Sequence, residues 1–434
     1  MGHGAKRNIA CAGKGLCEAE RISTTCACSK LMSTTLEQAE KLLADLVSFP
    51  TVTGLPNGDM IAYIKAYLEG LGIPVMLDAH EDGLRFNLFA TIGSGQSDGI
   101  ILSGHTDVVP ATGDGWSRDP FVLHKHDGRL YGRGAVDMKG FLATALAMAP
   151  AFKAAEDKLT IPLHYAFTFD EEVGSFGAAQ MPDFLRREGI KPAMAIIGEP
   201  TGMRPFIGHK GGLELVAEIR GSAGHASDPR GKVNAIYYAA QLIGHIEQIA
   251  NRLADTPVTA SPFDPPYTTL SVGHIEGGEA RNIIPDYCQF LWEIRPLPSD
   301  NAYEILADIK AYIADVLEPE MQRVSADAEI SITEISWCPG MDARAGSSAA
   351  SLIARLWTNE APSVVSFGTD GGHYQQAGME TIVFGPGGMD EMHQPDEFIE
   401  VDAMRQGLAF LENLLRYAQE PQARSQTPRS GDGA

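Results

Sequence analysis

Potential metal ligands follow four short apolar runs of the sequence, three directly after the run and one through a glycine-rich loop. They are His105 with Asp107, Asp170 to Glu172, Glu199 and His393, and a further carboxylate, Asp137, precedes an apolar helical stretch. In an open α/β sheet the carboxyl ends of the strands meet at one edge, so these side chains are expected to lie together. Buried carboxylates at close range need a compensating cation. Mixed imidazole and carboxylate ligands favour zinc, cobalt or manganese over calcium or magnesium.

Each of these residues alone has a plainer explanation. A histidine after a strand is usually structural, adjacent Glu171 and Glu172 usually belong to a solvated face, and an acid such as Asp137 usually caps a helix. Only their combination at one sheet edge favours a metal site.

The elements that would position these residues alternate between strands and helices, which predicts an α/β domain. The predicted strands are 86–92, 99–103, 161–169, 193–198 and 381–384, and the predicted helices are 141–152, 176–187, 347–357 and 403–417. A further helix opens near residue 34 with its apolar side chains on one face: Leu36, Ala39, Leu43, Leu46 and Val47.

The middle of the chain has a different pattern. Residues 213–220, 268–275 and 286–295 alternate like antiparallel strands, and 233–253 and 301–317 read as long amphipathic helices. The order β, α, β, β, α predicts a compact α+β insert over residues 209–322 that splits the α/β domain into 32–208 and 323–418. Residues 1–31 and 419–434 are expected to be disordered, with translation beginning at Met32.

Three segments resemble the M20 family of metallopeptidases and deacylases. They are residues 104–110 (GHTDVVP), 132–140 (GRGAVDMKG) and 170–174 (DEEVG), and their order and spacing match the family from about residue 32 to residue 417. The resemblance implies a zinc-dependent, exopeptidase-like α/β catalytic domain with an inserted α+β (ferredoxin-like) dimerisation or lid domain. It also implies a homodimer.

The resemblance assigns roles to individual residues. Asp137 would bridge two Zn²⁺ ions, for which Co²⁺ could substitute. His105 and Glu199 would complete one site, and Glu172 and His393 the other. Glu171 would be the general base, taking a proton from the metal-activated water and returning it to the leaving amine. The carboxylate of Asp107 would accept the second ring N–H of His105. The family also implies a cis peptide between Asp137 and Met138.

Further residues of the resemblance concern the substrate. His225 would donate to the oxyanion, often from the partner subunit; an ordinary loop histidine is the less favoured alternative. Asn282 and Arg295 would bind the substrate, with Arg295 suited to a carboxylate through its bidentate fork; an internal salt bridge is the alternative for Arg295. Gly368 and Thr369 would line the substrate pocket, where turn glycines are the plainer explanation.

Within the family, residues 196–203, 208–211, 385–388 and 393–397 are most similar to the branch that hydrolyses N2-acetyl-L-ornithine to L-ornithine and acetate, a step of arginine biosynthesis. The loop 369–372 (TDGG) departs from the TEAG of that branch, which leaves the side-chain selectivity open. The alternatives are a succinyl-diaminopimelate desuccinylase, a broader aminoacylase or dipeptidase, and a binding protein on an inactive scaffold.

Composition excludes other classes of protein. The formal net charge of −22 over 434 residues disfavours nucleic-acid binding. No apolar run approaches the roughly 20 residues of a membrane span. Four of the six cysteines crowd the first 31 residues, which argues against a disulfide-stapled secreted fold. Together with the family resemblance, these exclusions lead us to expect a cytoplasmic enzyme that acts on a small N-acyl amino acid.

Overall fold

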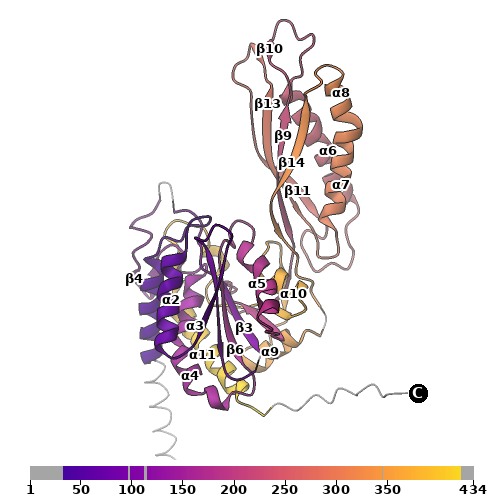
Figure 1. Ribbon diagram of the computed structural model, residues 1–434. Helices are drawn as coiled ribbons and strands as arrows, with labels where there is room; N and C mark the ends of the chain where they lie inside the picture. Colours follow the sequence, from indigo (N-terminus) through magenta and orange to yellow (C-terminus); the bar gives the residue numbers. More distant parts are fainter. Residues whose placement is uncertain (1–32, 96–97, 112–114, 345, 422–434) are drawn as a thin grey trace, which may run out of the picture.

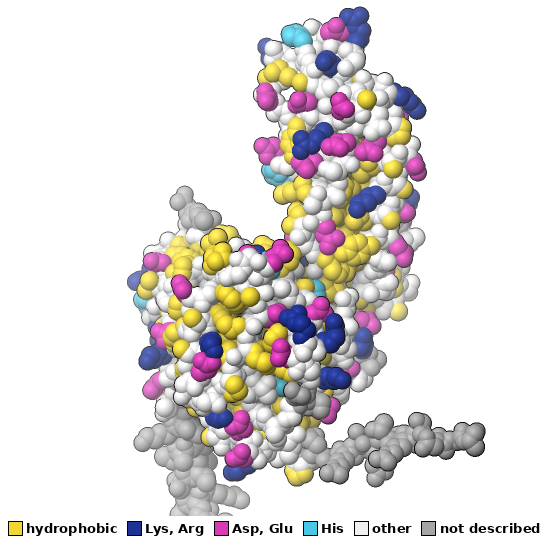
Figure 2. Space-filling model, in the orientation of Figure 1, with side chains coloured by type: hydrophobic (Ala, Val, Ile, Leu, Met, Phe, Trp, Pro, Cys, Tyr) yellow, Lys and Arg dark blue, Asp and Glu magenta, His cyan; other side chains and the backbone are white. Residues whose placement is uncertain are grey.

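The computed structural model describes residues 33–95, 98–111, 115–344 and 346–421. The chain forms two lobes, of which the larger contains its N- and C-terminal parts and the smaller its middle (Figure 1). The surface turns inward where the lobes meet (Figure 2). Among the described helices, none has the length and apolarity needed to cross a bilayer. The expectations for residues 1–31, for a start at Met32 and for the tail beyond residue 421 lie outside the described residues.

An eight-stranded mixed sheet forms the centre of the larger lobe, in the order β1-β2-β6-β3-β7-β16-β8-β15. The neighbours β6, β3, β7 and β16 are parallel, and every residue of β3 and β6 is buried. Such continuous burial follows from apolar runs that are covered on both faces. The strands are β1 Val75–Ala79, β2 Phe86–Ile92, β3 Ile100–His105, β6 Leu163–Thr168, β7 Met194–Ile197, β8 Phe206–His209, β15 Ser363–Val365 and β16 Glu380–Val383.

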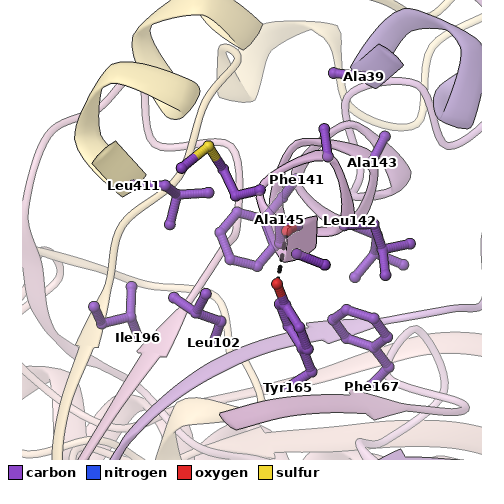
Figure 3. Packing of buried hydrophobic residues seen from close by; sticks show 14 of the residues in the cluster. Ala39, Leu102, Phe141, Leu142, Ala143, Ala145, Tyr165, Phe167, Ile196 and Leu411 are labelled. Atoms are coloured by element: carbon purple, nitrogen blue, oxygen red, sulfur yellow. Dashed lines mark hydrogen bonds between the residues drawn. The ribbon is translucent and has the colours of Figure 1, made fainter. Parts of the chain in front are cut away.

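Helices cover both faces of this sheet, and the alternation along each strand decides which core a residue joins. In β3, Ile100 and Leu102 belong to the core under helix α3, whereas Ile101 belongs to the core under α5. In the first core the hydroxyl of Tyr165 donates a 2.9 Å hydrogen bond to the carbonyl of Ala145 in α3 (Figure 3). The helices of this lobe are 33–47, α2 Gly58–Gly70, α3 Lys139–Ala147, α4 Ala149–Ala154, α5 Phe176–Arg187, α9 Ser348–Leu356, α10 Gly371–Gln376 and α11 Val401–Ala418.

A three-stranded sheet ties the C-terminal part of the chain to the segment before α3. It consists of β17 Phe398–Glu400, β5 Arg129–Tyr131 and β4 His124–His126, in that order. Phe398 pairs with Tyr131, and the backbone N–H of Gly132 donates to the carbonyl of Glu397 at 2.9 Å. The residues around His393 are thereby held beside the turn that contains Asp137.

The smaller lobe is a βαββαβ unit with its own hydrophobic core. Its four-stranded antiparallel sheet has the order β11-β13-β9-β14, which is the ferredoxin-like arrangement. The elements are β9 Gly212–Arg220, α6 Ala235–Asp255, β11 Thr269–Gly277, β13 Tyr287–Arg295, α7 Ala302–Tyr312, α8 Glu318–Gln322 and β14 Glu329–Cys338, and a two-stranded ribbon of β10 Gly224–His225 and β12 Ile283–Ile284 extends from it.

Two expectations need correction. The insert, expected to end at residue 322, includes β14, because Glu329–Cys338 pairs along the whole of β9. The expected helix over residues 141–152 is divided into α3 and α4. Pro150 lies in the first turn of α4, where its missing N–H costs no helical hydrogen bond. The predicted strand 86–92 and helix 176–187 have the predicted bounds.

The separate core of the smaller lobe leads to a stability prediction. Phe290 is fully buried in that core, whereas its neighbour Leu291 points to the other face of β13 and is 41% exposed. Phe290→Ala should therefore lower the free energy of unfolding of this lobe by about 3–5 kcal/mol, while Leu291→Ala should cost less than about 1 kcal/mol. Urea unfolding of both variants measures the difference. Equal losses would contradict the assigned core.

Candidate metal centre

The expected ligands converge at the carboxyl ends of the central parallel strands. His105 is the last residue of β3, Glu199 follows β7 by two residues, and Glu171 and Glu172 follow the end of β6 at Thr168. His393 is reached from β16 through a short 3-10 turn, Met389–Glu391. The sheet edge therefore gathers side chains that lie up to 288 positions apart in the sequence, from His105 to His393.

Asp137 lies at the centre of the cluster and faces a histidine with each of its two oxygens. Its Oδ1 is 3.0 Å from Nε2 of His105, and its Oδ2 is 3.2 Å from Nε2 of His393. Two groups with metal-ligand spacing result: His105, Asp137 and Glu199 form one, and Asp137, Glu172 and His393 form the other. Because both groups contain Asp137, this carboxylate is placed to bridge two ions.

The two groups differ in their exposure. His105, Asp137 and Glu199 are all buried, and Oε1 of Glu199 lies 3.8 Å from Nε2 of His105. In the other group, Nε2 of His393 lies 3.0 Å from Oε2 of Glu172, and the side chain of His393 is 48% exposed. The second group is thus the one that opens toward solvent.

The residues fit a pair of divalent cations. Burial, and then the charge of Asp137, raises the pKa of Glu172 to about 7, and the same two causes raise the pKa of Glu199 well above its usual value. The buried Oε1 of Glu172 has no hydrogen-bond partner among the described residues. Bound cations would offset the repulsion between these carboxylates and would give the unpaired oxygen of Glu172 a partner.

The position of His105 is fixed by Asp107, but not through the expected atom. Nδ1 of His105 lies 2.9 Å from the backbone carbonyl of Asp107 and 3.6 Å from its carboxylate. A carbonyl only accepts, so Nδ1 is the donor and Nε2 is free to bind metal. The carboxylate of Asp107 instead accepts the backbone N–H groups of Glu171 (3.1 Å) and Glu172 (3.2 Å). The expected carboxylate contact to His105 is corrected accordingly.

The three consecutive acids after β6 point in different directions. Asp170 pairs with Arg85 and accepts the N–H of Gly54 at 2.8 Å. Glu172 faces His393, and Glu171 lines the cleft beside the ligands. Burial, and then the charge of Glu199, raises the pKa of Glu171 well above its usual value. A carboxylate with a raised pKa is suited to take up and release a proton.

The residue that holds the backbone of Asp137 was not predicted from the sequence. Glu397 is 1% exposed and ion-pairs with Arg133 at 2.7 Å. Its carboxylate accepts the N–H groups of Gly134 (3.0 Å), Val136 (2.9 Å) and Asp137 (3.1 Å). The peptide between Asp137 and Met138 is cis, as expected.

A cleft of about 470 Å³ joins the ligands to the smaller lobe. Arg295 and Gly368 line it, as expected for substrate contacts. The guanidinium of Arg295 is also paired with Glu293 at 2.7 Å, which is the salt bridge expected as the alternative. Thr369 is buried beside Gly368, and its hydroxyl accepts the N–H of Gly371 at 3.1 Å. The further lining residues that were not predicted include Glu214, Ser336 and Cys338.

His225 and Asn282 lie far from the ligands within one chain. His225 belongs to β10, which is at the end of the smaller lobe remote from the larger one (Figure 1). The carbonyl of Asn282 accepts the N–H of Ala226 at 2.9 Å, so the two residues are neighbours there. A single chain therefore does not bring them to the metal cluster.

Comparison with known proteins agrees with this geometry. The sequence profile described as Peptidase family M20/M25/M40 matches residues 101–417. An acetylornithine deacetylase of Shigella sonnei is 36% identical over 347 residues, which cover 79% of this chain and 86% of that protein.

Solved structures share the fold. A tripeptidase of Staphylococcus aureus has a TM-score of 0.68 at 22% identity, covering 88% of this chain and 98% of that one. A peptidase of Bacillus subtilis described as binding a dinuclear metal has a TM-score of 0.61 at 15% identity, covering 90% and 99%. At these identities the likeness concerns the fold alone.

The shared carboxylate leads to a prediction about metal binding. Asp137→Ala should weaken Zn²⁺ binding at both sites by more than about 100-fold, because even the loss of an outer hydrogen-bond partner costs 10–100-fold. Glu199→Ala should weaken one site only. Calorimetric titration of metal-stripped protein measures both sites, with the exposed Asp183→Ala as the control. An Asp137→Ala variant that keeps one site at wild-type affinity would show that the carboxylate is not shared.

Proposed function

Because the chain belongs to peptidase family M20/M25/M40, we propose that it is a metal-dependent deacylase that hydrolyses N2-acetyl-L-ornithine to L-ornithine and acetate. The observation that carries the proposed reaction is the pair of ligand groups that share Asp137 at one end of the cleft. The proposed substrate rests on the acetylornithine deacetylase that is 36% identical over 79% of the chain. Such an activity belongs to arginine biosynthesis in the cytoplasm.

The proposed cofactors are two Zn²⁺ ions, which Co²⁺ can replace. His105, Asp137 and Glu199 would hold one ion, and Asp137, Glu172 and His393 the other. When bound, the pair supplies Lewis-acid polarisation of the amide carbonyl and lowers the pKa of the attacking water. Imidazole and carboxylate ligands in groups of three leave coordination positions open for water and substrate.

The protein's own groups carry the proton. The carboxylate of Glu171 takes a proton from the attacking water as the new C–O bond forms. The C–N bond of the amide then breaks, and Glu171 gives the proton to the departing nitrogen. The carboxylate of Asp107 holds the backbone N–H of Glu171 and of Glu172. One residue therefore positions both the proposed base and a proposed ligand.

Contacts across the cleft would orient the substrate. Arg295 lines the cleft and can bind the α-carboxylate through its planar fork. Gly368 also lines the cleft, where its backbone would limit the space for the acyl group, and Thr369 next to it is buried.

A second copy of the chain would supply His225 and Asn282, which makes the active form a homodimer. Among the described strands, β11 lies at the edge of its sheet and pairs with β13 alone. It exposes Ile275 by 50%. Helix α6 contacts β11 and exposes Tyr237 by 68%. Hydrophobic side chains extend along this lobe (Figure 2). An unpaired strand edge flanked by exposed apolar side chains is a typical surface for pairing with an identical copy.

A substrate panel tests the proposed function. Zinc-loaded protein should hydrolyse N2-acetyl-L-ornithine with a higher kcat/KM than N-succinyl-L,L-diaminopimelate or N-acetyl-L-methionine, measured by release of the free amine. Glu171→Gln should retain two Zn²⁺ and lose nearly all turnover, because only the proton relay is removed. Preference for the succinylated substrate would replace the proposal with a desuccinylase. Negligible turnover of all three by zinc-loaded protein would favour a binding protein.

Mixed dimers test the role of His225. His225→Ala should lower kcat by roughly 10²–10³-fold if its ring donates to the oxyanion. Mixing this variant with Glu171→Gln should restore about one quarter of wild-type activity, since half of the randomly assorted dimers then contain one intact site. Restoration requires that His225 acts across the dimer. If His225→Ala is fully active, or if mixing restores nothing, the partner-subunit assignment is wrong.

A further inference from the structure

Two oppositely charged side chains project into the cleft from the smaller lobe. Glu214 of β9 and Arg295 of β13 both line it, as does Ser336 of β14. Glu214 is the cross-strand partner of Glu293 on one side and of Ser336 on the other. A row of polar groups therefore crosses three strands of the small sheet, on the face opposite its hydrophobic core.

The charges of this row are unequally engaged. Glu293 takes both described contacts of the Arg295 guanidinium, at 2.9 Å from Nε and 2.7 Å from Nη2. Glu214 accepts a neutral hydrogen bond of 3.0 Å from the hydroxyl of Ser336. The other carboxylates among the described residues that line the cleft are the three proposed ligands and the proposed base: Asp137, Glu172, Glu199 and Glu171. Glu214 is thus the lining carboxylate that the proposed mechanism leaves unused.

The row lies directly against the loop that carries the proposed base. Gly174, two residues after Glu172, packs so closely on β14 that an added Cβ would lie 2.1 Å from Cβ of Ser336. Ser336 is 3% exposed and is the hydrogen-bond donor to Glu214. These contacts, from the loop to Ser336 and from Ser336 to Glu214, place this carboxylate on the cleft wall next to the loop that carries the proposed base.

From this placement we infer that Glu214 binds a side-chain ammonium group of the substrate, which restricts the cleft to N-acyl derivatives of basic amino acids. The inference rests on the proposed function and adds the residue that selects the side chain. Arg295 would bind the α-carboxylate of the substrate and Glu214 its side-chain ammonium group. The wall of the cleft thus offers one cation and one anion to a substrate that carries one charge of each sign. A carboxylate in a partly buried cleft binds an ammonium group by a charge-assisted hydrogen bond. A substrate with an apolar side chain would leave that carboxylate without a partner.

The test compares two substrates that differ only at the ammonium position. N2-acetyl-L-ornithine and N-acetyl-L-norleucine have side chains of equal length, with a methyl group replacing the ammonium in the second. Glu214→Gln keeps the shape of the side chain and an acceptor for Ser336. It should lower kcat/KM for N2-acetyl-L-ornithine by roughly 10–100-fold and leave the value for N-acetyl-L-norleucine within about twofold. The zinc content should stay at two ions.

Glu218→Gln is the matched control. Glu218 lies four residues along β9 on the same face as Glu214, accepts the hydroxyl of Tyr287 at 2.6 Å, and does not line the cleft. Its substitution should leave both substrates unchanged.

The outcomes separate this inference from the function on which it rests. If the wild-type protein hydrolyses N2-acetyl-L-ornithine no better than N-acetyl-L-norleucine, the proposed substrate is wrong before any variant is considered. If the wild-type protein prefers N2-acetyl-L-ornithine and Glu214→Gln keeps that preference, the role of Glu214 is overturned. An equal loss for both substrates overturns it as well, because a structural or general positioning role would then explain the effect.

Discussion

The concentration of negative charge around Asp137 is the constraint on which the rest of the structure depends. Carboxylates from three separate segments approach one another within a buried volume, with only two imidazoles between them. Uncompensated, such a cluster would cost several kcal/mol for each buried charge, and protons would have to neutralise part of it, as the raised pKa values of Glu172 and Glu199 indicate. Divalent cations held at this sheet edge would relieve the repulsion between the carboxylates.

Two further carboxylates hold the cluster in place, and each acts on backbone rather than on side chains. Asp107 accepts two consecutive N–H groups at the loop after β6. Glu397 accepts three at the turn before α3, and its charge is balanced by Arg133. Backbone N–H groups only donate, so they fix the orientation of Asp107 and Glu397 without occupying the proposed metal-ligand atoms. Fixing the backbone of adjacent residues also limits how far the ligand side chains can move apart under their mutual repulsion.

The sequence predicted the parts of the molecule that depend on neighbouring residues. Strand β2 and helix α5 have the predicted bounds, and the ligand cluster follows from where the apolar runs end. Contacts between residues far apart in the sequence were not predictable. Glu397, for example, accepts a hydrogen bond from the backbone N–H of Asp137, 260 positions away. The division between α3 and α4 was visible in Pro150 and was overlooked. Strand β14 escaped notice because a β-bulge between Glu334 and Ser336 reverses its alternation, so that Ile335 is 44% exposed and Ser336 is buried.

That bulge also explains how chemistry and selectivity can be divided between the two lobes. It turns Ser336 toward the cleft, beside Glu214, while Leu213 and Leu215 on either side of Glu214 remain in the core of the smaller lobe. In a strand, neighbouring residues face opposite sides, so a change at Glu214 alters the charge of the cleft without removing apolar contacts from that core. The proposed metal ligands all belong to the larger lobe. A fold arranged in this way can accept a different side chain through a few residues of β9, β13 and β14, since none of them contributes to the charge balance around Asp137.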